Sequence, residues 1–271
     1  MNISLSRVWC LISFEIVRLF NNKRGLLALL AFATIWFIIL FYFVSSASAI
    51  VTSPSSESMA SQLFSALGLS ALLDWPVAEY AIYWLVAVYF FPSFALLVCS
   101  DQICSDKHRG TLRFITLRTT RTELVLGRFL GQLLIMAILI LMTSVATMLL
   151  ASVRDSALLL PSFQIGATLF VELIIVVMPF IALMSLLNVL VNSARLAIVT
   201  ATLIFALGPL VLAFINYQFG QTFYLNWLFP GDQIGSILSQ SGAVASQYTL
   251  PLVQTVMLLI VSHLLMKRAS L

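Results

Sequence analysis

Charged residues are scarce in this sequence, and their scarcity excludes most classes of protein. Only 9% of the 271 residues are Asp, Glu, Lys or Arg, whereas 61% are hydrophobic. Soluble domains carry about 25% charged and about 45–50% apolar residues, so an ordinary soluble fold is excluded. The three cysteines, Cys10, Cys99 and Cys104, fall in segments that we assign below to the cytoplasm. Thiols stay reduced there, so we expect packing roles and no disulfide.

Motifs for nucleotide hydrolysis and metal binding are also missing. No Gly-x-x-x-x-Gly-Lys-Ser/Thr phosphate-binding loop occurs, and the two histidines, His108 and His263, belong to no cluster with metal-ligand spacing. The basic residues sit in short segments between apolar runs, which indicates membrane topology and not nucleic-acid binding. We therefore expect no enzyme, cofactor, metal or nucleic-acid partner. An intramembrane hydrolase using Glu172 and His263 is the one enzyme left open.

Long apolar runs are what the chain has in abundance, each near the ~20 residues that cross a bilayer. They predict an all-α polytopic membrane protein with a single membrane domain, residues 1–271. The six spans are expected at residues 26–50, 79–100, 124–151, 163–191, 196–216 and 250–266. We expect Gly208-Pro209 to interrupt the fifth span, and Trp75, Tyr80, Tyr83 and Trp84 to lie at the membrane interface.

The first 24 residues carry a different pattern. Apolar side chains recur three or four residues apart, at Leu5, Val8, Trp9, Ile12, Ile16, Leu19 and Phe20. This spacing predicts an amphipathic helix over residues 1–24 that lies on the membrane surface, with Lys23-Arg24 among the lipid headgroups.

The distribution of Lys and Arg predicts the orientation of the chain. Thirteen of the 14 basic residues fall in one set of alternate segments, and Arg154 alone falls in the other. Because Lys and Arg concentrate in cytoplasmic loops, both termini and the polar segment 101–121 are expected in the cytoplasm. The expected location is the bacterial inner (cytoplasmic) membrane.

The polar segment 101–121 is the most informative part of the sequence. We expect Thr111 to cap a short helix with an apolar side formed by Leu112, Phe114, Ile115 and Leu117. Arg113 and Arg118 project elsewhere on this helix. Such a helix suits docking into a groove of a partner protein; the alternative is a solvated basic patch that binds lipid headgroups.

Two strings in this region carry a family resemblance. They are His108-Arg-Gly-Thr-Leu-Arg113 and Thr119-Thr-Arg-Thr-Glu-Leu-Val-Leu-Gly-Arg-Phe-Leu-Gly131. Together with Phe14-Glu15 and Leu228-Phe-Pro-Gly-Asp232, they resemble type-2 ABC exporter permeases, closest to the compact six-span branch that includes the nitrous-oxide reductase maturation permease. The sequence departs from the family where Lys107-His108-Arg109 replaces the usual acidic residue before the Gly-Thr-Leu turn, with Asp106 the nearest acid.

The resemblance implies a permease subunit of an ABC exporter, paired with a second copy or a paralogue. Two cytoplasmic ATPase subunits would bind ATP and Mg. The residues expected to couple to them are Glu15, Asp106, Arg109, Gly110, Thr111, Leu112, Arg113, Arg118 and Arg121. Two alternatives stay open: a non-transporting anchor that relays ATPase motion to an extracytoplasmic partner, and an ion-coupled secondary transporter.

Two further acidic residues are candidates for an intramembrane or exit site. Glu172 lies about ten residues into the fourth span, where an ionisable side chain is costly. It is either a substrate- or proton-linked group or a hydrogen-bonded structural carboxyl. Asp232 is expected to cap a short helix over residues 233–240, which the resemblance assigns to the outer, exit side of the membrane.

Overall fold

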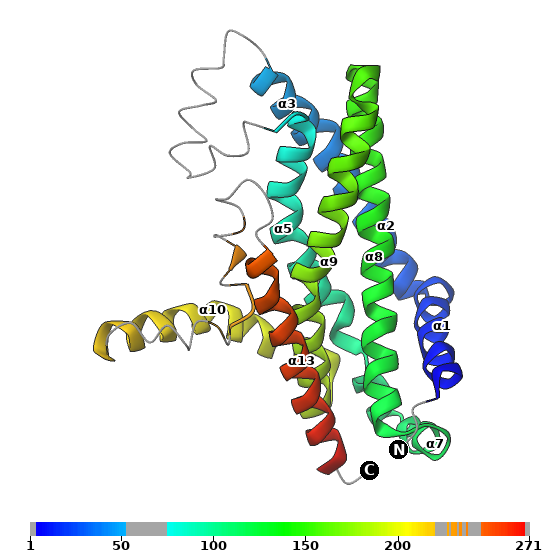
Figure 1. The fold of residues 1–271 in the computed structure, drawn as a ribbon. Coiled ribbons are helices and arrows are strands. Elements are labelled where there is room, and N and C mark those ends of the chain that lie inside the picture. The colour runs from blue at the N-terminus through cyan, green and yellow to red at the C-terminus, as the bar shows by residue number, and fades with distance from the viewer. Residues whose placement is uncertain are drawn as a thin grey trace.

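The protein is a bundle of long helices (Figure 1). The computed structural model describes residues 4–52, 75–219, 227, 229–231, 233–234, 237 and 245–268, and within these ranges no strand occurs. In the same ranges, six helical stretches are long and apolar enough to cross a membrane: Gly25–Ser48, Ala78–His108, Arg121–Arg154, Ser156–Leu190, Ala194–Gln218 and Tyr248–Arg268. The all-α polytopic fold and the six expected spans are confirmed.

Helix α9 (Leu159–Leu190) forms the centre of the bundle. It packs against α5 (Ala78–Val98), α8 (Arg121–Arg154) and α13 (Ala245–Arg268), and these helices surround it in Figure 1. A helix that is apolar on all sides is normally buried. In α9 every residue from 179 to 185 is buried.

Helix α5 buries aromatic side chains that the sequence suggested for the membrane interface. Tyr80, Tyr83 and Trp84 are at most 2% exposed. The Tyr80 hydroxyl donates to the carbonyl of Ser144 at 2.8 Å, and the Tyr83 hydroxyl is 3.0 Å from that of Thr143, so both tyrosines join α5 to α8. The expectation that these three side chains face the interface was wrong. A buried tyrosine needs a hydrogen-bond partner for its hydroxyl, and α8 provides one in each case.

Helix α1 (Leu5–Asn21) is the expected amphipathic helix, and it lies lengthwise along the first half of α8. Its apolar stripe is only partly covered by the bundle: Val8 and Ile12 are buried, whereas Leu5 and Trp9 are 86% and 65% exposed. Packing on α8 therefore covers part of the apolar stripe that we assigned to the membrane surface.

The first and fifth spans lie at the edge of the bundle. The first consists of α2 (Lys23–Ile38), a π-helical stretch η1 (Ile39–Val44) and α3 (Ser45–Thr52). The fifth, α10 (Ala194–Phe219), is one continuous helix through Pro209, so the expected interruption at Gly208-Pro209 was wrong. Figure 1 shows α10, in yellow, pointing away from the other spans.

The two ends of the bundle differ in charge. Helix α7 (Thr111–Arg118), the start of α8 and the end of α13 meet at one end, which we call the basic end (Figure 1). Arg154 lies at the opposite end of α8, where its Nε is 3.0 Å from Glu79 Oε1 at the start of α5. The alternating charge of the sequence is therefore separated along the bundle axis.

Candidate functional site

The polar segment between the second and third spans folds into two short helices at the basic end. After η3 (Cys99–Asp101), α6 (Cys104–His108) is followed by Gly110 and then by α7. Gly110 has a φ of 70°, in the left-handed region, where a residue with a Cβ is strained. This glycine lets the chain reverse sharply between the two helices.

Thr111 has a different role from the one expected. Gly110 occupies the N-cap position of α7 and no side chain caps the helix. The Thr111 hydroxyl donates instead to Asp106, at 3.2 Å from Oδ1 and 3.3 Å from the backbone oxygen. The expected cap was wrong because Thr111 is already inside the helix, and its hydroxyl holds the Asp106 carboxylate in place.

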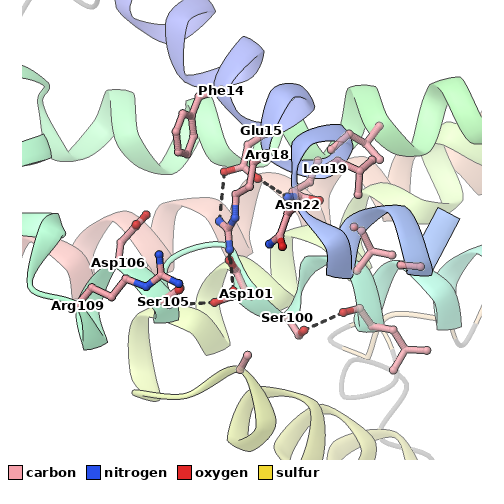
Figure 2. Close-up of a pocket in the computed structure, with 17 residues that line it drawn as sticks. Phe14, Glu15, Arg18, Leu19, Asn22, Ser100, Asp101, Ser105, Asp106 and Arg109 are labelled. Atoms are coloured by element: carbon pink, nitrogen blue, oxygen red, sulfur yellow. Dashed lines mark hydrogen bonds and ion pairs between the residues drawn. The ribbon is translucent and has the colours of Figure 1, made fainter.

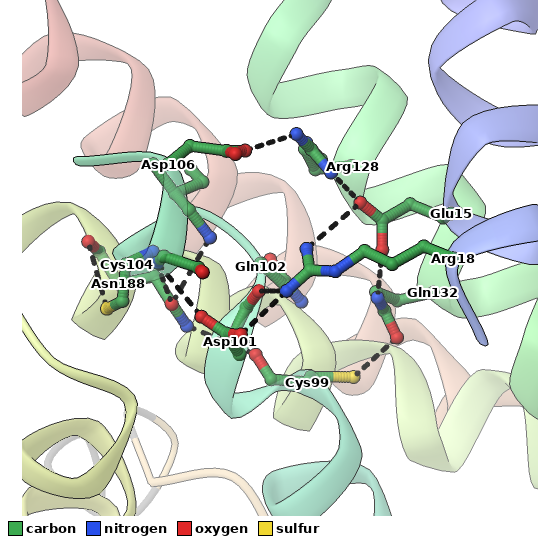
Figure 3. A network of polar contacts seen from close by, with 12 residues as sticks. Glu15, Arg18, Cys99, Asp101, Gln102, Cys104, Asp106, Arg128, Gln132 and Asn188 are labelled. Carbon is green, nitrogen blue, oxygen red and sulfur yellow. Dashed lines mark hydrogen bonds and ion pairs between the residues drawn. The ribbon is translucent and has the colours of Figure 1, made fainter. Parts of the chain in front are cut away.

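Arg128 is the centre of a polar network between α1, α6 and α8 (Figure 3). Its side chain is 1% exposed; Nη1 donates to Glu15 and Nη2 to Asp106. The second oxygen of Glu15 accepts a hydrogen bond from Gln132 Nε2 at 2.7 Å. The guanidinium also lies over the Phe14 ring, 5.2 Å from its centroid, a favourable cation–π arrangement.

A second ion pair joins α1 to the same segment. Arg18 Nη2 is 2.7 Å from Asp101 Oδ2 and 2.8 Å from its backbone oxygen. The other carboxylate oxygen of Asp101 accepts from the Ser105 amide at 2.9 Å, in the first turn of α6. We call these six residues, Glu15, Arg18, Asp101, Asp106, Arg128 and Gln132, the Arg128 cluster.

Two glycines of α8 allow α1 to approach closely enough for this network. A Cβ on Gly127 would lie 2.7 Å from Leu11 Cβ, and one on Gly131 would lie 2.9 Å from Glu15 Cβ. Small residues four apart form the groove by which helices in membranes pack closely. The Gly-x-x-x-Gly part of the sequence signature, Gly127 to Gly131, is therefore the surface on which α1 packs. Arg128 is one of the residues between the two glycines.

The starts of α1 and α8 are joined by Glu123. It forms a capping box with Thr120, its Oε1 accepts from the Ser4 amide at 2.8 Å, and its Oε2 is 3.6 Å from Arg7. The distance in sequence between contacting residues is nearly the same at the start of α1 and further along it. It is 119 residues from Ser4 to Glu123 and 117 residues from Glu15 to Gln132. This nearly constant separation means that α1 and α8 run parallel, side by side.

Arg121 ties the last helix to this assembly. Its Nη1 donates to the backbone oxygen of Met266 at 2.8 Å and to that of Lys267. A cation at the end of a helix satisfies carbonyls that have no partner within the helix. The start of α8 thus holds both α1 and the end of α13.

The side of α7 that faces away from the bundle is exposed. Leu112 is buried, but Phe114 and Leu117 are 72% and 82% exposed, and Arg113 and Arg118 are exposed beside them. The single apolar side expected for this helix is divided: one part packs on the bundle, and the other projects outward at the basic end. A hollow of about 540 Å³ between α1 and α7 includes Phe114, Leu117 and Arg118 in its lining.

The remaining candidates lie away from the Arg128 cluster. Glu172 is half-buried on α9 and hydrogen-bonds to Tyr248 of α13, an arrangement that supports the structural reading of its carboxyl. Asp232 lies outside the described residues. Arg109 is exposed at the end of α6 and lines a cavity beside the cluster. Within the described part of the chain, no three His, Cys, Asp or Glu side chains gather to hold a metal.

Glu15 and Asp106 were suggested separately by the sequence, and the structure brings them together. The residues that connect them were not singled out in the sequence. Arg128, Gln132, Arg18 and Asp101 were missed as site residues. Arg128 and Gln132 had a detectable signal: both fall within the expected third span, four residues apart, where polar side chains are costly and face other helices. Arg18 and Asp101 gave no signal beyond surface charge.

The fold and the cluster define a polytopic α-helical membrane protein whose amphipathic first helix is held against its third span by buried charges. No family model matches the sequence, and no curated protein matches it.

Proposed function

We propose that this chain is the membrane-spanning permease subunit of an ABC transporter of the exporter type, in a bacterial inner membrane. The observation that carries the proposal is the construction of α7. One side is anchored in the bundle through Leu112, while Phe114, Leu117 and two arginines project from the basic end. An apolar pair flanked by cations suits a helix that docks in an acidic groove.

The contacts behind α7 suggest how force on this helix would reach the membrane. Thr111 holds Asp106, Asp106 pairs with Arg128, and Arg128 pairs with Glu15. A push on α7 would therefore move α1 and the start of α8 together. Because Arg121 binds the end of α13, the same displacement would reach the last span.

The proposal includes two kinds of partner protein, ATPase subunits and a second permease chain. The separate ATPase subunits bind ATP and Mg and carry out hydrolysis, and this chain converts their motion into opening and closing of a path for an amphipathic or apolar cargo. A second permease chain is proposed to cover α10. Seven of its exposed apolar side chains recur three or four residues apart, as in the seam between two packed helices: Leu196, Val199, Leu203, Leu207, Leu210, Phe214 and Tyr217.

The proposal is tested with the ABC-type ATP-binding protein that we expect the neighbouring reading frame to encode. Co-expression should give a complex of two permease and two ATPase chains, measured by native mass. In the double variant Arg113→Glu/Arg118→Glu, like charges would face the acidic groove, which costs several kcal/mol. We expect the co-purified ATPase to fall at least about tenfold.

The matched control is Lys267→Glu/Arg268→Glu, which makes the same change in charge on exposed side chains at the basic end, outside α7. It should keep the ATPase bound. Normal assembly of the α7 variant would remove these arginines from the proposal. Transport that needs an ion gradient and no ATPase would favour a secondary transporter, and ATP hydrolysis without movement of lipid or peptide across vesicles would favour a membrane anchor.

A further inference from the structure

A polar cavity of about 700 Å³ opens beside the Arg128 cluster (Figure 2). Its wall is built from α1, the start of α2, the end of α5, η3, α6, α8 and the start of α10. The charged side chains in the lining are Glu15, Arg18, Asp101, Asp106 and Arg109. The cavity is thus lined by both signs of charge.

The cavity lies at one boundary of the hydrocarbon layer. Between Arg128 and Arg154, helix α8 has no charged residue. These 25 intervening positions correspond to about 37 Å of helix, enough to cross a hydrocarbon core of about 30 Å. The Arg128 cluster therefore sits where the headgroups of one leaflet begin.

Polarity changes in the same direction along two of the spans that line the cavity. In the second span, Leu97 of α5 lies one turn deeper in the bundle than Asp101 of η3. In the third span, Ile135 of α8 lies about one turn deeper than Gln132. On these two spans the polar groups face the boundary and the apolar groups face the membrane interior, as in a phospholipid.

We propose that this cavity binds an aminophospholipid, with the phosphate on Arg109 and the ammonium on Asp101. Among the described residues Arg109 forms no ion pair, and Figure 2 shows its side chain beside Asp106 in the cavity wall. Asp101 is 38% exposed. Its Oδ2 accepts from Arg18 and its Oδ1 from the Ser105 amide, and a carboxylate oxygen can accept more than one hydrogen bond, which leaves acceptor capacity toward the cavity. The acyl chains follow Leu97, Ile135 and Ala28.

The mixture of charges selects this class of lipid. Arg18 and Arg128 already pair with the three carboxylates of the lining, so a purely anionic headgroup could use Arg109 but would offer no cation to the exposed side of Asp101. A headgroup with a phosphate and a primary ammonium can satisfy both signs, because the ammonium has three donors. The proposal needs only the membrane-spanning fold, and it stands apart from the ABC assignment.

The experiment uses the whole chain purified in detergent, with bound lipid counted by native mass spectrometry. Phosphatidylethanolamine, phosphatidylglycerol and phosphatidylcholine with identical short acyl chains are added in turn. We expect phosphatidylethanolamine to be retained about tenfold more strongly than the other two, the effect of one charge-assisted hydrogen bond. Equal retention of all three would identify non-selective boundary lipid and overturn the proposal.

Three variants locate the site. Arg109→Gln should weaken retention of phosphatidylethanolamine about tenfold, and Asp101→Asn should abolish its advantage over phosphatidylglycerol. The matched control, Arg113→Gln, removes an exposed arginine outside the cavity and should leave retention unchanged. Unaltered retention in Arg109→Gln would contradict the proposal, provided that circular dichroism and elution volume match the parent chain.

A competition distinguishes a lipid from a soluble phosphate ester. Glycerophosphoethanolamine has the same headgroup without acyl chains. It should displace the lipid only weakly, because the apolar contacts with Leu97 and Ile135 are missing. Displacement as effective as by the intact lipid would show that the cavity takes a free phosphate compound instead, and would overturn the assignment to lipid.

Discussion

At the scale of single residues, the most consequential side chain is Arg128. It is 1% exposed, and two carboxylates, on Glu15 and Asp106, share its guanidinium. A buried ion pair contributes little net stability over an apolar alternative, but removing one partner leaves a charge buried and uncompensated. The cluster is therefore sensitive to loss of one charge and tolerant of loss of an opposite pair.

We expect Arg128→Met to destabilise the protein by about 3–5 kcal/mol, the cost of breaking a buried pair. This corresponds to a fall in apparent melting temperature on the order of 10 °C, measured by intrinsic fluorescence in detergent. The double variant Glu15→Gln/Arg128→Met should recover part of the loss, because no unpaired Glu15 carboxylate remains.

The control for this cycle is Arg113→Met, which removes an exposed arginine of α7 and should change stability by no more than about 0.5 kcal/mol. If Arg128→Met is as stable as this control, the guanidinium does not hold the two carboxylates as described.

At the scale of helices, the decisive contact is the one between α1 and α8. Leu11 and Glu15 of α1 lie over Gly127 and Gly131 of α8, and the ion pairs form only because the two backbones approach this closely. Close packing and buried charge are thus one feature. Separating the helices by the width of a methyl group would also lengthen the contacts of Arg128.

We expect Gly127→Val and Gly131→Val to undock α1, because even a single Cβ at these positions would lie within 3 Å of α1 side chains. Overpacking of this kind costs about 1–3 kcal/mol. The measurement is the rate of tryptic cleavage at Lys23, the first residue of α2, which should rise in both variants. Ala167→Val, which introduces the same side chain at an exposed position of α9, should leave the rate unchanged.

At the scale of the whole molecule, the separation of charge along the bundle predicts how it sits in the membrane. Thirteen of the 14 Lys and Arg residues belong to the set of alternate segments that includes the basic end, and Arg154 belongs to the other set. Basic loops remain in the cytoplasm. The basic end, with α7 and both termini, is therefore expected to face the cytoplasm.

A protease-sensitive tag measures this orientation directly. Inserted at Thr119, between α7 and α8, it should be cut in inside-out vesicles and protected in spheroplasts. The same tag inserted after Asp155, in the turn that follows α8, should give the opposite result. Cleavage of both tags from the same side would contradict the six-span orientation.

The sequence by itself determined the fold class, the six spans and the separation of basic residues. These follow from local properties: a run of about 20 apolar residues can cross a bilayer only as a helix, and positive charge sorts to one side. Glu15 and Asp106 became candidates through the resemblance of short sequence strings and not through these local properties. Reasoning from local properties failed at Thr111, at Gly208-Pro209 and at the aromatic residues of α5, because each outcome depended on the neighbouring element.

Only the tertiary structure decided which residues form the site. Glu15 and Arg128 are separated by 113 residues, and neither the charge of one nor the position of the other reveals the pair. Their meeting depends on α1 lying parallel to α8 in one register, fixed by Gly127, Gly131 and Glu123. Helix packing brings distant residues together through complementary shape and close approach. A periodic apolar pattern in the sequence does not predict which helix will pack against which.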